Sequence, residues 1–118
     1  MNPLVSIITP SYNSANFIAE TIQSVQNQTH QNWEMIIVDD GSSDETESVV
    51  LSINQNDNRI QFHKLSQNSG PAVARNTGIE KASGDYMTFI DADDIWFPTF
   101  IANNIKTIQE TGIPFVFS

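Results

Sequence analysis

Short apolar runs alternate along this chain with longer segments that carry apolar residues on one side only. Runs rich in β-branched and aromatic residues predict five strands, at about residues 4–8, 32–38, 59–65, 86–90 and 113–117. Apolar residues at helical spacing predict four helices between them, at about 14–28, 42–53, 71–81 and 98–110. Strict alternation of strands and helices is typical of the α/β class. We therefore predict a doubly wound, largely parallel sheet with helices on both faces and right-handed crossovers.

Residues at the predicted helix ends agree with these boundaries. Ser42 and Glu45 have the spacing of a capping box for the second helix. Pro71 suits the first turn of the third helix, and Gly112 suits the end of the fourth. In the third helix, small residues such as Gly78 predict close packing against a neighbouring segment.

Composition limits the classes of function that the chain can have. Its 118 residues suffice for one domain with a single core, and the absence of cysteine excludes disulfides and thiolate metal sites. The 14 Asp and Glu residues outnumber the 5 Lys and Arg residues, so the formal net charge is −9. Such a charge disfavours binding to a nucleic-acid backbone. A phosphorylated ligand would need local neutralisation by a metal or an Arg.

The two ends of the chain lead to expectations about location and assembly. The N-terminus lacks the pattern of a signal peptide, and no apolar run approaches the roughly 20 residues that span a bilayer. We expect a cytoplasmic domain, which in a longer protein can lie at the inner face of the membrane. The last predicted strand ends beside Ser118, so we expect a chain truncated at its C-terminus. An uncovered last strand also predicts pairing with a second copy in a homodimer.

Three carboxylates follow the fourth predicted strand within four residues. Two charges about 4 Å apart interact by roughly 4 kcal/mol at an effective dielectric of about 20, so Asp91, Asp93 and Asp94 repel one another. A divalent cation would turn this repulsion into attraction, and carboxylate oxygens are the ligands that Mg²⁺ or Mn²⁺ prefers. The alternative is a solvated acidic turn that caps the next helix.

Polar and aromatic residues also follow the first two strands, and the carboxyl ends of parallel strands share one edge of a sheet. Tyr12 offers an aromatic face for a base, and Asp40 offers a carboxylate for a base or a ribose. With the acid cluster, these groups meet the needs of a nucleotide diphosphate. Alternatively, Tyr12 is a packed surface aromatic and Asp40 belongs to a helix-capping turn.

The two remaining candidates for polar chemistry are a cation and an imidazole. Arg75, on the third helix, can pair with Asp40, Asp91 or a diphosphate, and we expect a structural salt bridge when no ligand is bound. His63 is interpreted as a half-exposed strand residue rather than a metal ligand.

Four segments in the same order resemble the N-terminal half of a family 2 glycosyltransferase, along nearly the whole chain. They are residues 5–13 (VSIITPSYN), 37–44 (IVDDGSSD), 68–76 (NSGPAVARN) and 91–94 (DADD). The resemblance implies a GT-A fold, in which a Rossmann-like half binds the sugar nucleotide. Residues 1–118 would be the sugar-nucleotide-binding part of the glycosyltransferase domain.

The resemblance also implies roles for individual residues. Pro10 and Tyr12 would lie against the base, Asp40 would hydrogen-bond the base, and Arg75 would lie near the nucleotide. Asp91 and Asp93 would form the family's Asp-x-Asp motif.

In that motif, Asp91 would face the ribose and the cation, and Asp93 would bind the cation, Mn²⁺ or Mg²⁺, with Asp94 as adjacent support. The full-length protein would transfer a sugar, with inversion, from a UDP-linked donor to a carbohydrate or lipid-linked acceptor, as in polysaccharide biosynthesis. The catalytic base is expected beyond Ser118, so this chain alone would be inactive.

Three alternatives belong to other classes of protein. A phospho-receiver domain would need an acidic pair at the end of the first strand, where this chain has Thr9, Pro10 and Ser11. A nucleotidyltransferase would need a Gly-rich phosphate loop after that strand, which this sequence lacks there. A catalytically silent nucleotide-binding module stays open.

Overall fold

Four parallel strands form the centre of the computed structural model, which describes residues 2–112. The strands lie in the order β3-β2-β1-β4, and each neighbouring pair is parallel. Strand order therefore reverses between β1 and β4, and ligands of open α/β sheets bind at such a switch point. The bounds are β1 (Val5–Ser11), β2 (Trp33–Asp39), β3 (Ile60–Lys64) and β4 (Tyr86–Phe89).

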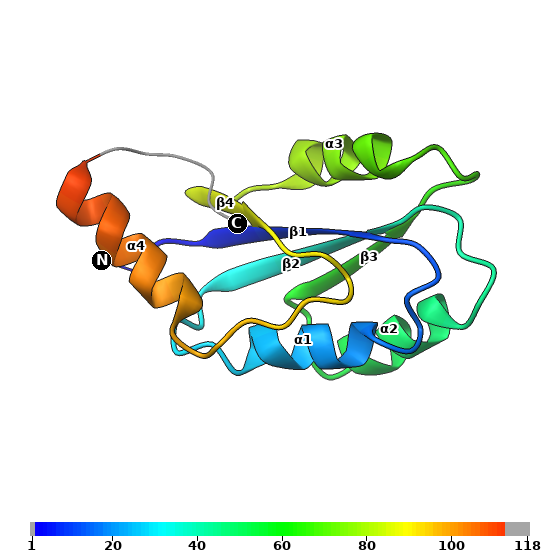
Figure 1. The fold of residues 1–118 in the computed structure, drawn as a ribbon, viewed down its shortest axis with the longest axis horizontal. Helices are drawn as coiled ribbons and strands as arrows, with labels where there is room; N and C mark the ends of the chain where they lie inside the picture. The colour runs from blue at the N-terminus through cyan, green and yellow to red at the C-terminus, as the bar shows by residue number, and fades with distance from the viewer. Residues whose placement is uncertain (1, 113–118) are drawn as a thin grey trace.

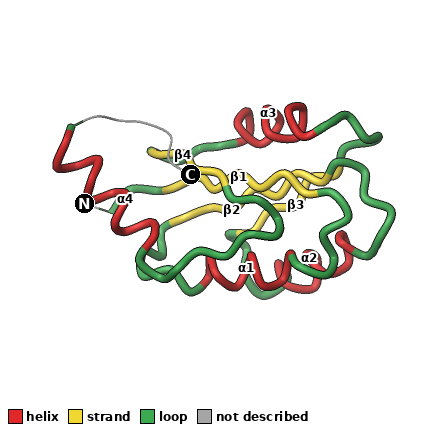
Figure 2. The backbone as a smooth tube through the Cα atoms, in the orientation of Figure 1, coloured by secondary structure: helices red, strands yellow, loops and turns green. Residues whose placement is uncertain are grey.

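Helices cover both faces of this sheet, as the alternating pattern predicted (Figure 1). One helix, α3, packs on β1 and β2 from one side, while α1 and α2 lie side by side on the other. The loops that follow β1, β2 and β3 lie together at one end of the sheet, and the loop after β4 begins part-way along β1 (Figure 2). The bounds are α1 (Ile18–Gln26), α2 (Thr46–Asn54), α3 (Pro71–Lys81) and α4 (Phe100–Thr111).

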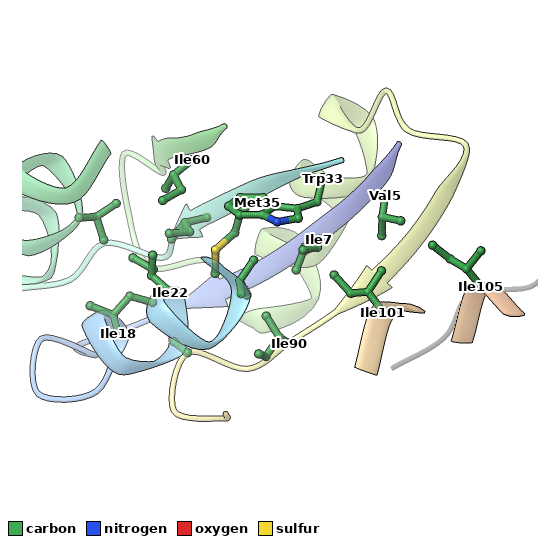
Figure 3. Packing of buried hydrophobic residues seen from close by; sticks show 14 of the residues in the cluster. Val5, Ile7, Ile18, Ile22, Trp33, Met35, Ile60, Ile90, Ile101 and Ile105 are labelled. Carbon is green, nitrogen blue, oxygen red and sulfur yellow. The ribbon is translucent and has the colours of Figure 1, made fainter. Parts of the chain in front are cut away.

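The two sheet faces carry cores of unequal size. The larger core lies between the sheet, α1, α2 and α4, and Figure 3 shows its side chains interlocking around Trp33 and Met35. The smaller core lies under α3, where Ala74 packs with Ile36 and Val38. There α3 approaches β1 so closely that a Cβ on Gly78 would lie 2.6 Å from Cγ2 of Ile8.

The first two helices begin later than the sequence pattern predicted. Residues 15–17 form turns, so α1 begins at Ile18 rather than near residue 14. The predicted capping box is wrong, because Ser42 Oγ donates to Asp39 and Glu45 makes no capping hydrogen bond. The carboxylate of Asp44 accepts from Thr46 N instead.

Other expectations concern the edges of the sheet and the membrane. Within residues 2–112, no helix combines the length and apolarity needed to cross a bilayer. The fifth strand predicted at 113–117 lies outside the described residues, and the homodimer stays a prediction. On edge strand β3, His63 is half-buried, as predicted. Two effects lower the pKa of His63 from its usual 6.5: mainly its burial, and to a smaller extent the positive charge of Lys81.

The close approach of α3 to the sheet can be tested with Gly78→Val. The added side chain must displace Ile8. We therefore expect the free energy of unfolding, measured by urea denaturation, to be about 1–3 kcal/mol lower than in the wild type. Ala72→Val is the control, because residue 72 is exposed on the same helix. Valine is a poorer helix former than alanine but a better one than glycine, so helix propensity alone would destabilise only the control. Equal destabilisation by the two substitutions would contradict the close approach.

Candidate functional site

Hydrogen bonds fasten the loop after β1 to the loop after β2. Asn13 N donates to Ser42 Oγ at 2.8 Å, and Ser43 N donates to Asn13 Oδ1 at 2.9 Å. Asn13 makes both contacts from the left-handed region, with φ 49°, which asparagine tolerates better than most residues. The two loops therefore hold each other at the carboxyl edge of the sheet.

Asp44 strengthens the same junction. Its carboxylate accepts from Thr46 Oγ1 and Thr46 N, and also from Ala15 N at 3.1 Å. Burial works against the charged carboxylate, but these hydrogen bonds outweigh it and lower the pKa of Asp44 from its usual 3.8. The ionised side chain thus joins α2 to the loop that leads into α1.

Asp40 links the loop after β2 to the start of α3. Its backbone N donates to Ser11 O at 2.8 Å, and its side-chain oxygens accept from Ser69 N at 2.7 Å and Gly70 N at 3.0 Å. Only 5% of Asp40 is exposed. Because each carboxylate oxygen has more than one lone pair, Asp40 can still accept a hydrogen bond from a ligand.

A row of buried polar side chains on and just after α1 holds the loop that carries the acid cluster. Thr21 Oγ1 donates to Ala92 O at 3.0 Å, and Ser24 Oγ accepts from Trp96 N at 3.2 Å. Residues 21, 24 and 28 lie three and four positions apart, so they share one side of the helix.

Gln28 completes this row beyond the end of α1. Its Nε2 donates to Phe97 O at 2.8 Å, and its Oε1 accepts from Ile101 N at 3.0 Å. Sequence reasoning missed Thr21, Ser24 and Gln28. Their shared spacing within a largely apolar face is a signal that could have identified them.

A pocket of about 320 Å³ opens between these loops and α3. It contains all five residues that sequence analysis assigned to nucleotide binding. The half-exposed ring of Tyr12 (50%) belongs to its wall rather than to the core. The pocket is lined by Pro10, Ser11, Tyr12, Asp40, Asn68, Gly70, Pro71, Ala74, Arg75 and Asp91.

Arg75 is the one positively charged residue of the pocket wall. The expected salt bridge with Asp40 or Asp91 is wrong: the described ion pairs join Arg59 to Asp57 and Lys64 to Glu47, and Arg75 has none. The carboxylate of Asp40 is instead occupied by backbone N–H groups. The guanidinium lies 5.4 Å from the centroid of the Phe89 ring, within cation–π range.

The three carboxylates after β4 form a cluster beside the pocket. Oxygen atoms of Asp91, Asp93 and Asp94 lie within 4.8 Å of one another, and all three residues are exposed. Hard, anionic oxygen ligands at such a separation fit Mg²⁺ or Mn²⁺. Asp91 also lines the pocket, whereas Asp93 adjoins Asp91 without being part of that wall.

The contacts of Gln28 can be tested with Gln28→Leu. Leucine fills a similar volume but leaves Ile101 N without a partner and removes one of the two hydrogen bonds that Phe97 O accepts, the other coming from Phe100 N. We therefore expect the free energy of unfolding to fall by about 1–3 kcal/mol. Gln23→Leu is the control, since Gln23 is exposed on α1. Urea denaturation measures the free energy of unfolding of both variants. A similar decrease in both would show that the hydrogen bonds of Gln28 contribute little to stability.

Known proteins share this fold and much of this sequence. The putative teichuronic acid biosynthesis glycosyltransferase TuaG of Bacillus subtilis (strain 168) is 44% identical over 116 residues, which cover 98% of this chain. The match covers 46% of TuaG, so the chain spans less than half the length of that relative.

Two solved structures resemble the whole described fold. S. aureus TarS, crystallised in complex with UDP, matches with a TM-score of 0.83 and 30% identity over 90% of this chain and 32% of that chain. The mannosyltransferase PcManGT from Pyrobaculum calidifontis, in complex with GDP-Man and Mn²⁺, matches with a TM-score of 0.83 and 29% identity over 92% of this chain and 33% of that chain. The predicted GT-A fold is thereby confirmed.

The family assignment follows from the sequence as well as from the fold. Residues 6–117 match the profile described as glycosyl transferase family 2. The phospho-receiver and nucleotidyltransferase alternatives are therefore not favoured. With its four-stranded parallel sheet, its strand-end pocket and this match over nearly its full length, the chain belongs to glycosyl transferase family 2.

Proposed function

We propose that this chain binds the nucleotide-sugar donor of a metal-assisted, inverting glycosyltransferase, with UDP as the nucleotide. The observation that carries the proposal is the convergence of Pro10, Tyr12, Asp40, Arg75 and Asp91 on one pocket beside an acid cluster. The complexes of TarS with UDP and of PcManGT with GDP-Man and Mn²⁺ support it.

The nucleoside end of the donor occupies the part of the pocket between β1 and α3. The ring of Tyr12 stacks on the base, and Pro10 packs beside it. Asp40 accepts a hydrogen bond from a base N–H, because Ser69 and Gly70 have already fixed the orientation of its carboxylate. Asp91 accepts from a ribose hydroxyl. Two aromatic or aliphatic surfaces with a few fixed polar groups are typical of a small-molecule site.

The diphosphate lies against Arg75. Its guanidinium has no carboxylate partner within residues 2–112, so its donors stay available, and its planar fork matches phosphate oxygens. In a chain of net charge −9, this local positive group is needed to hold a polyanionic ligand near three acids.

Asp91 and Asp93 would hold Mg²⁺ or Mn²⁺, with Asp94 adjacent to them. A bound divalent cation supplies charge stabilisation to the departing nucleotide diphosphate. The acids of the site are then committed to the donor and the cation, so the base that takes the proton from the acceptor hydroxyl belongs elsewhere in the enzyme. A catalytically silent fragment would share the binding steps and differ only in the lack of turnover.

The role of Tyr12 predicts that Tyr12→Ala weakens UDP binding by about 5- to 100-fold, the range expected for loss of one base stack. Phe17→Ala is the control, since Phe17 is a similarly exposed aromatic (53%) outside the pocket wall. Calorimetry with UDP in the presence of Mn²⁺ measures both variants. If both variants lost UDP affinity equally, or if Tyr12→Ala lost only Mn²⁺ binding, Tyr12 would lie outside the base site.

The role of Asp93 predicts that Asp93→Asn makes UDP affinity independent of Mn²⁺ while circular dichroism shows an intact fold. Glu110→Gln is the control, because it removes one exposed acid at the far end of α4 with the same change in net charge. UDP affinity that still rises on addition of Mn²⁺ in the Asp93 variant would refute the assignment.

A further inference from the structure

The three carboxylates after β4 are gathered by a single turn of the backbone. This segment is still bonded to β1 at Ile90, whose N donates to Ile8 O at 3.1 Å, and Asp94 N then donates to Asp91 O at 3.0 Å. A hydrogen bond from the fourth residue back to the first closes a β-turn, here over residues 91–94. The acids are therefore the first, third and fourth residues of one turn, and their oxygens lie within 4.8 Å of one another.

Ala92, the second residue of this turn, is held in two ways. Its side chain is buried in the larger core, and its carbonyl oxygen accepts from Thr21 Oγ1 at 3.0 Å. Thr21 is fully buried on α1, and its Oγ1 also lies 3.4 Å from Phe17 O. A threonine hydroxyl has one proton to donate, and the shorter contact is the one to Ala92. The helix thus holds the turn at the residue between Asp91 and Asp93.

This hold acts against the electrostatics of the turn. Three carboxylates at such separations repel one another, and the repulsion favours conformations in which the turn opens. A cation that met an open turn would have to order its backbone on binding, and the entropic cost of that ordering would weaken the affinity. Because Ala92 is fixed when the protein folds, the ligand oxygens are already together before a cation binds.

Resting on the proposed function, we propose that Thr21 is a positioning residue of the cation site. Its hydroxyl sets the affinity for Mg²⁺ or Mn²⁺ by holding the backbone between two ligands, Asp91 and Asp93. Thr21 offers no ligand atom to the cation and is not part of the pocket wall, so it acts only through the carbonyl oxygen of Ala92. Removing its hydroxyl should therefore weaken the cation site without weakening the nucleotide pocket itself.

The experiment measures UDP affinity by calorimetry on the full chain at increasing Mn²⁺. The Mn²⁺ concentration that gives half of the full gain in affinity reports the strength of the cation site. Thr21→Val keeps the shape of the side chain but removes the donor to Ala92 O. We expect this concentration to rise about tenfold, the lower end of the range found when groups that orient metal ligands are removed. UDP affinity without a cation should change less than about threefold.

Thr88→Val is the matched control, because it makes the same chemical change at an equally buried residue of β4 whose hydroxyl has no partner within residues 2–112. Val25→Ala is the control for stability, since it removes buried apolar volume from the same helix and no hydrogen bond. Both should leave the Mn²⁺ requirement within about twofold of the wild type.

Two further variants separate the hydroxyl from the fold. Thr21→Ser keeps a hydroxyl at the same position, so we expect it to bring the Mn²⁺ requirement to within about threefold of the wild type. Thr21→Ala replaces Thr21→Val in the comparison if the valine variant fails to fold. Circular dichroism reports the fold of each variant.

The outcomes separate this inference from the proposed function. Wild-type protein whose UDP affinity does not respond to Mn²⁺ overturns both. If the wild type responds and the folded variant without the hydroxyl responds at the same Mn²⁺ concentration, only the role of Thr21 is overturned. The same conclusion follows if Thr21→Ser needs as much Mn²⁺ as Thr21→Val, or if Val25→Ala raises the requirement equally.

Discussion

The site depends on a row of buried hydrogen bonds between α1 and the loop that follows β4. That loop leaves the sheet and carries three mutually repelling carboxylates, so neither ladder hydrogen bonds nor its own electrostatics hold it in place. Thr21, Ser24 and Gln28 satisfy its backbone groups instead. Buried backbone polar groups must find partners, so this loop has a defined path even before a cation or a ligand neutralises it. The same contacts orient Trp96 and the beginning of α4.

The acids at the carboxyl edge of the sheet divide into two groups with different physical roles. Asp39 and Asp40 are buried, and each accepts backbone N–H donors that fix neighbouring loops. Asp91, Asp93 and Asp94 are exposed and face one another. A carboxylate that is already hydrogen-bonded stabilises the fold, whereas three unneutralised carboxylates repel one another, a repulsion that a bound cation would relieve. Among the described residues, Arg75 forms an ion pair with neither group.

Sequence patterns revealed more of the fold than of the contacts within the site. The class of fold, the location of all four described strands and the convergence of Tyr12, Asp40 and Asp91 at one edge followed from periodicity and chain order. These features are local or depend only on the parallel arrangement of strands. The capping box at Ser42 was wrong because Ser42 Oγ donates to Asp39, a residue before the predicted helix. The salt bridge expected of Arg75 was also wrong within residues 2–112, where the carboxylate of Asp40 accepts from two backbone amides. Local spacing carries no information about such competitors.

By itself, the sequence determined which residues stand at the ends of strands, because alternation of apolar runs with amphipathic segments places each strand end in the chain. The tertiary structure alone decided which of these residues are satisfied and which remain available to a ligand. Ser24 meets Trp96 across 72 positions, and Asp40 meets Ser69 across 29. Pairing over such separations depends on how the helices pack on the sheet, which the local sequence pattern does not specify.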